Sequence, residues 1–585
     1  MGVTLVRTKG MVALYIVLAA VVSAGAALCL GGPLYVLWPI LGIVALAALC
    51  FLPPGINRRL SMTAAVFSVL LTASIGMRYF LWPEQHPFSP WDIPAVICLL
   101  ILFFITAVTA LGRFHLLENR FWSRDKGKWK PWQIFLLGFF LMLLGWLPYY
   151  LRFYPGCSSY DSYNIMMQAL GKIELGDWHP VLYTLVLRLF MSAGVAFNDY
   201  TAGNAAFTAF QMAGIAAGLS YAVCWLYRKG LRMFWIVITI LLFAFVPMFG
   251  LLSITMWKDV PFSLLILLLS LQLYDIAQTR GEALLHIRGA VAFIAVGSGM
   301  ALLRHNGLYI LLATVGILAV MLRRRILRAL PALAGSVALV LLIQGAYSLC
   351  GIAKSPFSES LSIPVQQIAR TVVTGGTITD EQQQSLERFL DLEKPKTYEP
   401  YLADNAKNSL RQEYLNAHKG EFLKLWASLL PANFEEYVRA YGLQTYGYWY
   451  PLPPFSIVDY PRDGARELGI VYQNLLSGIP WLEDPGFIYY YLGIGVMVWI
   501  CIFLITHMIY RRRKKPLLAF VPILGVWGTL MLATPVADTM RYILVLPLVL
   551  PFLIFLTARK FDGSQADGPP AEGTAAAEII CEEVE

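Results

Sequence analysis

The sequence predicts an all-α polytopic membrane protein, and three observations support that prediction. Of the 585 residues, 58% are hydrophobic and only 14% are charged, whereas soluble proteins carry about a quarter charged residues. Apolar runs of about 20 residues, the length that crosses a hydrocarbon core about 30 Å thick, recur from Met11 to Leu556. Short basic clusters separate these runs, so the net charge of +9 belongs to loops and nucleic acid is not an expected partner.

We expect about 14 transmembrane helices from these runs. They lie near residues 11–30, 33–53, 61–81, 93–112, 133–151, 203–227, 232–252, 259–277, 287–303, 307–322, 329–350, 486–510, 517–535 and 541–558. The first run is about 20 residues long, which exceeds the roughly 7–15 residues of a signal-peptide core. We therefore expect it to remain as the first span.

The positions of Lys and Arg predict the orientation of the helices, because cytoplasmic loops carry an excess of basic residues. The strongest basic segments are 113–132, 228–232, 323–328 and 511–515. All four fall on one side only if the short apolar stretch His179–Gly194 does not cross the membrane. We therefore expect this stretch to form a juxtamembrane helix in the outer interface, with both chain termini in the cytoplasm.

This topology divides the chain into five predicted regions. They are N-terminal spans with a basic cytoplasmic loop (1–132), a membrane core (133–350), an extracytoplasmic and mainly helical domain (351–485), C-terminal spans (486–558) and a disordered cytoplasmic tail (559–585). The juxtamembrane helix belongs to the first large outer loop, which follows the span near 133–151.

Three groups of ionisable residues lie at span boundaries on the same predicted outer side. They are Asp161 with Asp177 and His179, Lys258 with Asp259 in "MWKDVP", and Arg304 with His305 in "LLRHNGLY". Ionisable groups at membrane depth are costly and tend to mark functional sites. Their location on one side of the membrane is the informative observation, because any one group alone has an ordinary explanation.

These ordinary explanations are structural. They are a solvated or helix-capping role for Asp161, an interfacial anchor at Lys258 and Asp259, a snorkelling side chain at Arg304, and an anchor or a partner of Asp538 at Arg541. The aromatic run "TYGYWYP" at residues 445–451 fits either interfacial packing or an acceptor groove. The pattern of residues alone leaves these alternatives open.

The order of motifs resembles the GT-C membrane glycosyltransferases, a superfamily that includes protein O-mannosyltransferases and aminoarabinose transferases. An outer loop with an Asp is followed by "HPVLYTLVLRLF", which is similar to the "HPPLYYLLL" segment of bacterial members, and then by a Lys-Asp turn. The resemblance covers roughly residues 130–350, and Arg541-Tyr542 also fits. The whole chain is more similar to uncharacterised Gram-positive multi-spanning proteins that have "RHNGLY"-like and "IPVQQIAR"-like stretches.

Two features depart from the GT-C pattern. The second acidic motif is Lys-Asp instead of an acidic pair, and the Trp-Trp-Asp signature of oligosaccharyltransferases is missing from the sequence. The resemblance still implies a GT-C-like helical bundle. It further implies transfer of a sugar from a polyprenyl-phosphate carrier to a cell-envelope glycan or protein acceptor on the outer face of the membrane.

The resemblance also suggests roles for individual residues. Asp161 would be the general base, and Asp259 would have a second catalytic role. Lys258 and Arg304 would bind the phosphate, and Arg541 is a less favoured candidate for the same role. His179 and His305 would be further substrate-binding residues. Some relatives use a divalent cation and others do not, so metal use stays open. The alternatives are a lipid-linked glycan transporter or flippase, and an envelope polymerase or ligase that uses a lipid-diphosphate donor.

Overall fold

Every regular element that the structure describes is a helix. The computed structural model describes residues 9–30, 34–123, 128–392, 398–452, 465–479 and 493–559. Within these ranges the chain forms helices and isolated bridges but no strand. Nine helices of the described ranges are long and apolar enough to cross a membrane, and a bent pair makes a tenth if it is counted as one span. The prediction of an all-α polytopic membrane protein is therefore confirmed.

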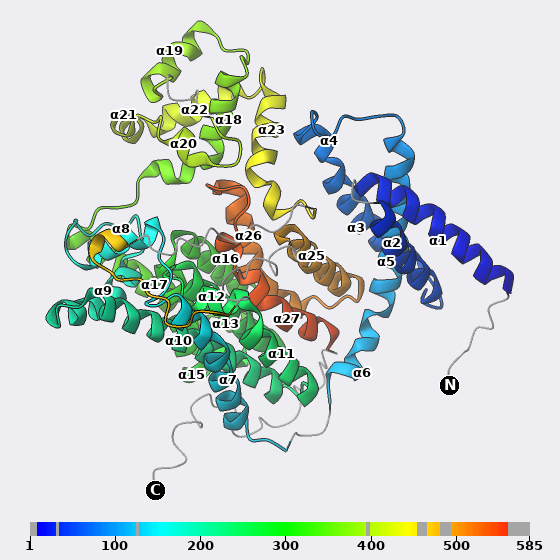
Figure 1. Cartoon of the computed structure of the whole chain (residues 1–585), viewed down its shortest axis with the longest axis horizontal. Helices are drawn as coiled ribbons and strands as arrows, with labels where there is room; N and C mark the ends of the chain where they lie inside the picture. Colours follow the sequence, from blue (N-terminus) through cyan, green and yellow to red (C-terminus); the bar gives the residue numbers. More distant parts are fainter. Residues whose placement is uncertain are drawn as a thin grey trace.

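The first helices form a group with its own core. They are α1 (Lys9–Leu30), α2 (Leu34–Cys50), α3 (Arg58–Gly76) and α5 (Asp92–Arg113). Ala26 of α1 and Leu99 of α5 are fully buried between these helices. The group lies at one side of the molecule (Figure 1), and it packs on the remaining helices through the edge-on contact of Phe67 with Trp499, whose ring centroids lie 5.7 Å apart.

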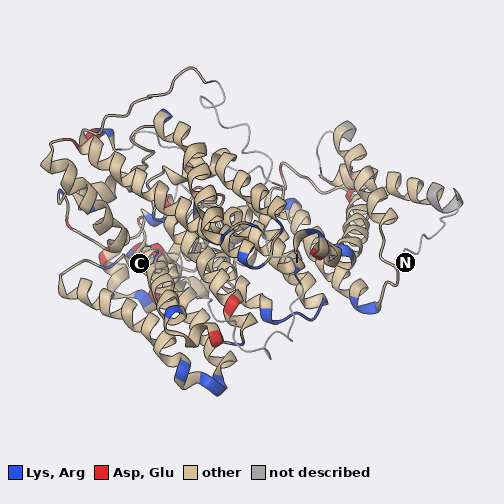
Figure 2. Cartoon of the chain, turned by 90° about the horizontal axis from the view of Figure 1, so that it is seen from below, with Lys and Arg blue, Asp and Glu red and all other residues tan. Residues whose placement is uncertain are grey.

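The other helices form a bundle with α13 and α27 at its centre. They are α7 (Pro131–Arg152), α10 (Tyr200–Arg228), α11 (Met233–Phe245), α12 (Pro247–Ser253), α13 (Asp259–Gln278), α15 (Ile287–Leu303), α16 (His305–Met321), α17 (Ile326–Leu349), α25 (Ile494–Tyr510), α26 (Val521–Ala533) and α27 (Val545–Ala558). The apolar windows of α13 and of the span that contains α27 are 72% and 78% buried, against 28% for the span that contains α17. A helix that is apolar on all faces is expected at the centre of a bundle. Charged residues are sparse along the helices and gather near their ends (Figure 2).

A proline produces the bend between α11 and α12. Val246, which precedes Pro247, has the extended conformation (φ −73°, ψ 118°) that a following proline favours, and the two helices meet at 58°. After α12 the chain passes Thr255, which forms an isolated parallel bridge with Cys157. The bend therefore brings the segment before α13 beside the segment that follows α7.

Helices α7 and α10 are antiparallel, and this arrangement settles the course of the segment between them. Tyr150 near the end of α7 donates to Ala205 O near the start of α10 (3.0 Å). Cys224, near the end of α10, contacts Pro131 O at the start of α7 (3.2 Å). The intervening segment forms α8 (Tyr160–Ala169) and α9 (Val181–Ala196), which lie together at one flank of the bundle (Figure 1). This segment begins and ends at the same end of the bundle.

A separate group of short helices lies beyond that end of the bundle (Figure 1). They are α18 (Ser362–Val373), α19 (Asp380–Phe389), α20 (Ala403–Lys407), α21 (Gln412–Ala417), α22 (Lys419–Leu429) and α23 (Phe434–Thr445). We call residues 357–448 the helical domain. Phe389 and Phe422 meet in its own buried core, with ring centroids 5.4 Å apart.

Residues 465–479 and the predicted tail 559–585 are two further segments of the predicted organisation. Residues 465–479 run along the end of α7, where the backbone N–H of Gln473 donates to Tyr154 O (2.8 Å). Apart from Arg559, the predicted tail 559–585 falls outside the described residues.

Candidate active site

One end of the bundle brings together six of the ionisable residues that the sequence singled out. We call them the charged cluster: Asp161, His179, Lys258, Asp259, Arg304 and Arg541. They come from the first turn of α8, the segment before α9, the start of α13, the end of α15 and the 3-10 turn Met540–Ile543 before α27. Segments that lie far apart in the sequence therefore build one site.

Arg541 is the centre of the charged cluster. Its Nε donates to Asp259 Oδ2 at 2.8 Å, and its Nη2 donates to Asp161 Oδ2. The guanidinium also lies 5.0 Å from the centre of the Trp257 ring, a distance at which a cation is attracted to the face of an aromatic ring. One arginine thus joins the two carboxylates that the sequence proposed as catalytic.

Arg304 and Lys258 supply two more positive charges. Arg304 Nη1 lies 2.9 Å from Asp259 Oδ1, and the Asp259 side chain is only 1% exposed. Lys258 Nζ lies 3.1 Å from His179 Nδ1. Asp259 thus has an arginine on each of its two oxygens, which suits it to hold the guanidinium groups in place.

Asp161 is the accessible carboxylate of the charged cluster. Its side chain is 30% exposed, whereas that of Asp259 is 1% exposed. Burial raises the pKa of Asp161, but the charges of Arg541 and Lys258 lower it more strongly, to about 2. Asp161 is therefore ionised at neutral pH and can be reached by a molecule that enters the site.

His179 differs from the other members because it is neutral. Burial and the nearby Lys258 lower the pKa of His179 to about 4, so the ring carries no charge at pH 7. The side chain is 2% exposed, stacks on Trp178 with ring centroids 5.2 Å apart, and its Nε2 has no hydrogen-bond partner. Burial also lowers the pKa of Lys258, to about 8, which leaves most of the lysine protonated at pH 7.

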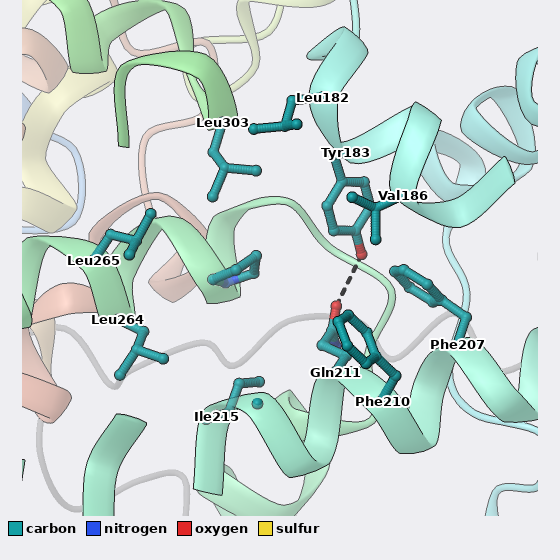
Figure 3. A pocket seen from close by; sticks show the side chains of 12 residues that line it. Leu182, Tyr183, Val186, Phe207, Phe210, Gln211, Ile215, Leu264, Leu265 and Leu303 are labelled. Carbon is teal, nitrogen blue, oxygen red and sulfur yellow. Dashed lines mark hydrogen bonds between the residues drawn. The ribbon is translucent and has the colours of Figure 1, made fainter. Parts of the chain in front are cut away.

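An apolar cavity of about 300 Å³ lies among α9, α10, α13 and the end of α15 (Figure 3). It is lined by Leu182, Tyr183 and Val186 of α9, Phe207, Phe210, Gln211, Gly214 and Ile215 of α10, Pro261, Leu264 and Leu265 of α13, and Leu303 of α15. Leu303 and Pro261 are close in sequence to Arg304 and Asp259. Phe210 (55%) and Gly214 of α10 are both exposed lining residues, so the cavity reaches the surface of the bundle beside α10.

Tyr183 and Gln211 form a hydrogen-bonded polar pair within this otherwise apolar lining. Tyr183 donates to Gln211 Oε1 at 2.9 Å (Figure 3), and Gln211 Nε2 donates in turn to the carbonyls of Ser253 and Thr255 at 2.9 and 2.8 Å. These bonds tie α9 and α10 to the segment that leads into Lys258.

Comparison with known protein families assigns most of the chain to one of them. Residues 171–568 match a family of unknown function, DUF6020. The chain belongs to this family. No curated protein and no solved structure matches the chain. The matched region contains the charged cluster except for Asp161, which lies ten residues before its start.

The site residues do not suit a divalent cation. The carboxylates of Asp161 and Asp259 both bind Arg541, and Asp259 also binds Arg304. A metal ion would have to displace these arginines and would meet Lys258 beside His179. Within the described residues, no group of three His, Cys, Asp or Glu side chains could hold a metal ion.

One predicted substrate-binding residue lies apart from the charged cluster. His305 Nε2 is 3.1 Å from Asp177 Oδ2, and the two side chains are 45% and 23% exposed. The backbone N–H of Asp177 donates to Ala353 O at 2.7 Å. The side chains of His305 and Asp177 thus fasten the segment before α9 to the start of α16.

The interpretation of Arg541 as a partner of Asp538 is wrong. Arg541 binds Asp161 and Asp259, which lie 380 and 282 residues earlier in the chain. The reason is that Thr539, which is extended (φ −143°, ψ 125°), and the following 3-10 turn carry the arginine into the bundle. The sequence indicated Tyr542 only as the neighbour of Arg541. In the structure its ring lies 5.3 Å from the Arg304 guanidinium and 5.6 Å from that of Arg541.

Proposed function

We propose that the chain is a membrane glycosyltransferase that moves a sugar from a polyprenyl-phosphate carrier to an acceptor in the cell envelope. The observation that carries the proposal is the position of the charged cluster beside an apolar cavity at one end of the bundle. A polyprenyl-phosphate sugar has the matching construction, with an anionic head on an apolar chain. The resemblance to GT-C enzymes supports the same class of reaction.

The charge of the site matches this donor. Lys258, Arg304 and Arg541 contribute three positive charges and Asp161 and Asp259 two negative ones, so the site has a surplus of one positive charge. The phosphodiester of a polyprenyl-phosphate sugar carries one negative charge. A buried charge is costly unless it is paired, so the bound donor neutralises the site.

The reaction requires a base and a means to stabilise the leaving group. Asp161 takes the proton of the acceptor hydroxyl while the oxygen attacks the anomeric carbon. The bond between that carbon and the phosphate oxygen breaks, and its electron pair stays on the polyprenyl phosphate. Arg304, Lys258 and Arg541 face the second negative charge that develops there. A single attack inverts the configuration at the anomeric carbon.

Arg541 has a second consequence for the base. A carboxylate with a pKa of about 2 holds a proton weakly. A donor phosphate shares the guanidinium of Arg541, which weakens its hold on Asp161 and raises the proton affinity of the carboxylate. Binding of the donor therefore prepares the base for the acceptor.

We further propose fourteen crossings, with both termini in the cytoplasm and the charged cluster outside. The shorter apolar helices α2, α15, α16 and α25 serve as spans together with the nine long helices and the bent pair α11–α12. The course of the segment between α7 and α10 supports a helix α9 that does not cross. The helical domain then faces the outside and covers the site.

Cysteine labelling tests this topology. In a variant whose native cysteines are replaced, we expect a membrane-impermeant maleimide to label Asn198→Cys from outside and to leave Arg324→Cys unlabelled until the membrane is opened. Asn198 and Arg324 are both exposed, so accessibility does not limit either reaction. The reverse pattern, with Arg324→Cys labelled from outside and Asn198→Cys protected, would mean that α9 crosses and would place Lys258 and Arg304 on the cytoplasmic side.

Filling the cavity should weaken binding of the lipid. A Cβ at Gly214, which lines the cavity, meets no atom within 4 Å, so Gly214→Leu is expected to fit and to displace one or two CH₂ groups of the chain. At about 0.8 kcal/mol per CH₂, the Kd for a polyprenyl phosphate in nanodiscs should rise by about 4–15-fold. Gly316→Leu is the matched control, because Gly316 of α16 is also exposed and open but lies away from the cavity. An equal effect of both variants would contradict a lipid site in the cavity.

The function itself is tested by incubating the purified protein with a panel of polyprenyl-phosphate sugars and analysing release of the lipid phosphate. Release that depends on an acceptor supports the transferase. Movement of an intact lipid-linked sugar between leaflets, without release, would support the flippase. The crowding of charges at one end of the bundle favours the transferase, because transporter sites lie near the midplane.

A further inference from the structure

The segment that carries Arg541 is held by the helical domain. Residues 534–538, "TPVAD", join α26 to the 3-10 turn that contains Arg541. The end of α26 lies next to α23 in Figure 1. The contacts between this segment and the helical domain are therefore contacts between the domain and the charged cluster.

Four successive carbonyls of this segment accept hydrogen bonds from the helical domain. The donors are Gln444 Nε2 to Thr534 O (3.0 Å), Ala403 N to Pro535 O (2.8 Å), Tyr448 Oη to Val536 O (2.9 Å) and Gly447 N to Ala537 O (3.2 Å). The N–H of Ala537 donates back to Tyr401 O at 2.9 Å. A segment bound at every carbonyl from 534 to 537 cannot shift without the domain.

The backbones also approach closely at Gly447. A Cβ at this position would lie 2.5 Å from Ala537 O and 2.8 Å from the Cα of Asp538. Only glycine allows this contact without displacing the segment, because the obstructing atoms belong to the backbone.

The contact at Gln444 continues into the interior of the helical domain. Gln444 Oε1 accepts from Gln366 Nε2 at 2.8 Å, and Gln366 Nε2 also donates to Glu399 O at 2.8 Å. Gln366 and Gln444 are 1% and 0% exposed. Gln366 belongs to the "IPVQQIAR" stretch of α18, for which the proposed reaction has no use. Gln366 Nε2 thus joins Gln444 to the backbone at Glu399, whereas Gln366 Oε1 has no hydrogen-bond partner.

We propose that Gln444 and Tyr448 are positioning residues for Arg541, and that the helical domain thereby controls the contact of Arg541 with Asp161. A molecule that moves the helical domain also moves the 534–538 segment and changes how firmly the guanidinium holds the carboxylate. The consequence for catalysis rests on the proposed function, but the placement of Arg541 does not.

The test measures how readily Arg541 reacts with phenylglyoxal in the full-length protein in nanodiscs, by mass spectrometry of peptides. Gln444→Met removes the donor to Thr534 O and keeps a similar volume. We expect Arg541 to react about tenfold faster, which corresponds to about 1.4 kcal/mol, the order of one lost buried hydrogen bond.

Gln367→Met is the matched control. Gln367 neighbours Gln366, is 8% exposed, and its bonds to Tyr437 O (3.1 Å) and from Trp426 Nε1 (2.8 Å) stay inside the helical domain. This variant should leave the reactivity of Arg541 within about twofold of the wild type, because no bond to the 534–538 segment is lost. An equal increase in both variants would indicate general loosening of the domain and would overturn the proposal, as would an unchanged Arg541 in Gln444→Met.

Two further measurements keep the result interpretable. Tyr448→Phe removes only the hydroxyl that donates to Val536 O, and it should raise the reactivity of Arg541 even if Gln444→Met does not fold. Arg370, paired with Glu436 in the helical domain (2.6 Å), should stay unchanged, and a parallel rise there would count against positioning. The assay uses no sugar donor, so failure of the proposed transferase and failure of this proposal are separate results.

Discussion

Replacing Asp161 with asparagine is expected to reduce sugar transfer by a factor of about 10²–10⁴, the usual contribution of a general base. Asparagine has nearly the shape of aspartate and can still accept a hydrogen bond from Arg541, which also remains bound to Asp259 (2.8 Å). The protein should therefore fold and insert as before. The measurement is release of polyprenyl phosphate by protein of verified monodispersity.

Asp177→Asn is the control for this prediction. Asp177 is also an aspartate of the segment between α7 and α10, but it contacts His305 instead of the charged cluster. A mild effect of Asp177→Asn together with a large effect of Asp161→Asn assigns the base to the charged cluster. Near-normal turnover of Asp161→Asn would remove Asp161 from the reaction.

The class of fold was predictable because it depends on properties that are local in the sequence. A long run of apolar residues forms a helix wherever it occurs in the chain, so most predicted spans have a matching helix. The prediction that the stretch His179–Gly194 does not cross the membrane depends on the positions of Lys and Arg in all the loops. The antiparallel contacts of α7 with α10, such as that of Tyr150 with Ala205, agree with it.

The arrangement within the site was harder to predict, because it depends on how helices from distant parts of the chain pack. The sequence around Arg541 is also typical of an interfacial anchor, and the partners of Arg541 lie 380 and 282 residues earlier. The cavity has the same origin, since it forms where faces of α9, α10 and α13 fail to meet. An arginine directly followed by tyrosine at the start of a span is the only local signal, and it is weak.

The second large effect is expected from loss of Asp259. The side chain is 1% exposed and binds Arg304 at 2.9 Å and Arg541 at 2.8 Å. Asp259→Leu leaves Arg304, which is only 16% exposed, without its carboxylate, and removing one partner of a buried ion pair typically costs about 3–5 kcal/mol. We expect a corresponding loss in the free energy of unfolding, visible as a lower temperature of thermal aggregation in detergent.

Removing the stranded cation should restore most of that stability. In Asp259→Leu/Arg304→Leu the buried pair is replaced by apolar side chains, and Arg541 keeps Asp161 as its partner. Asp275→Leu is the control on the same helix. Asp275 pairs with Lys229 at the opposite end of α13, with side chains 28% and 24% exposed, and accepts from Trp225 Nε1 at 2.7 Å. We expect a smaller loss than for Asp259→Leu, because water still reaches both charges of this pair. If the double variant is no more stable than Asp259→Leu, or if Asp275→Leu is equally damaging, the loss does not come from a stranded buried charge. The electrostatic account of the charged cluster, and with it the surplus charge offered to a phosphate, would then fail.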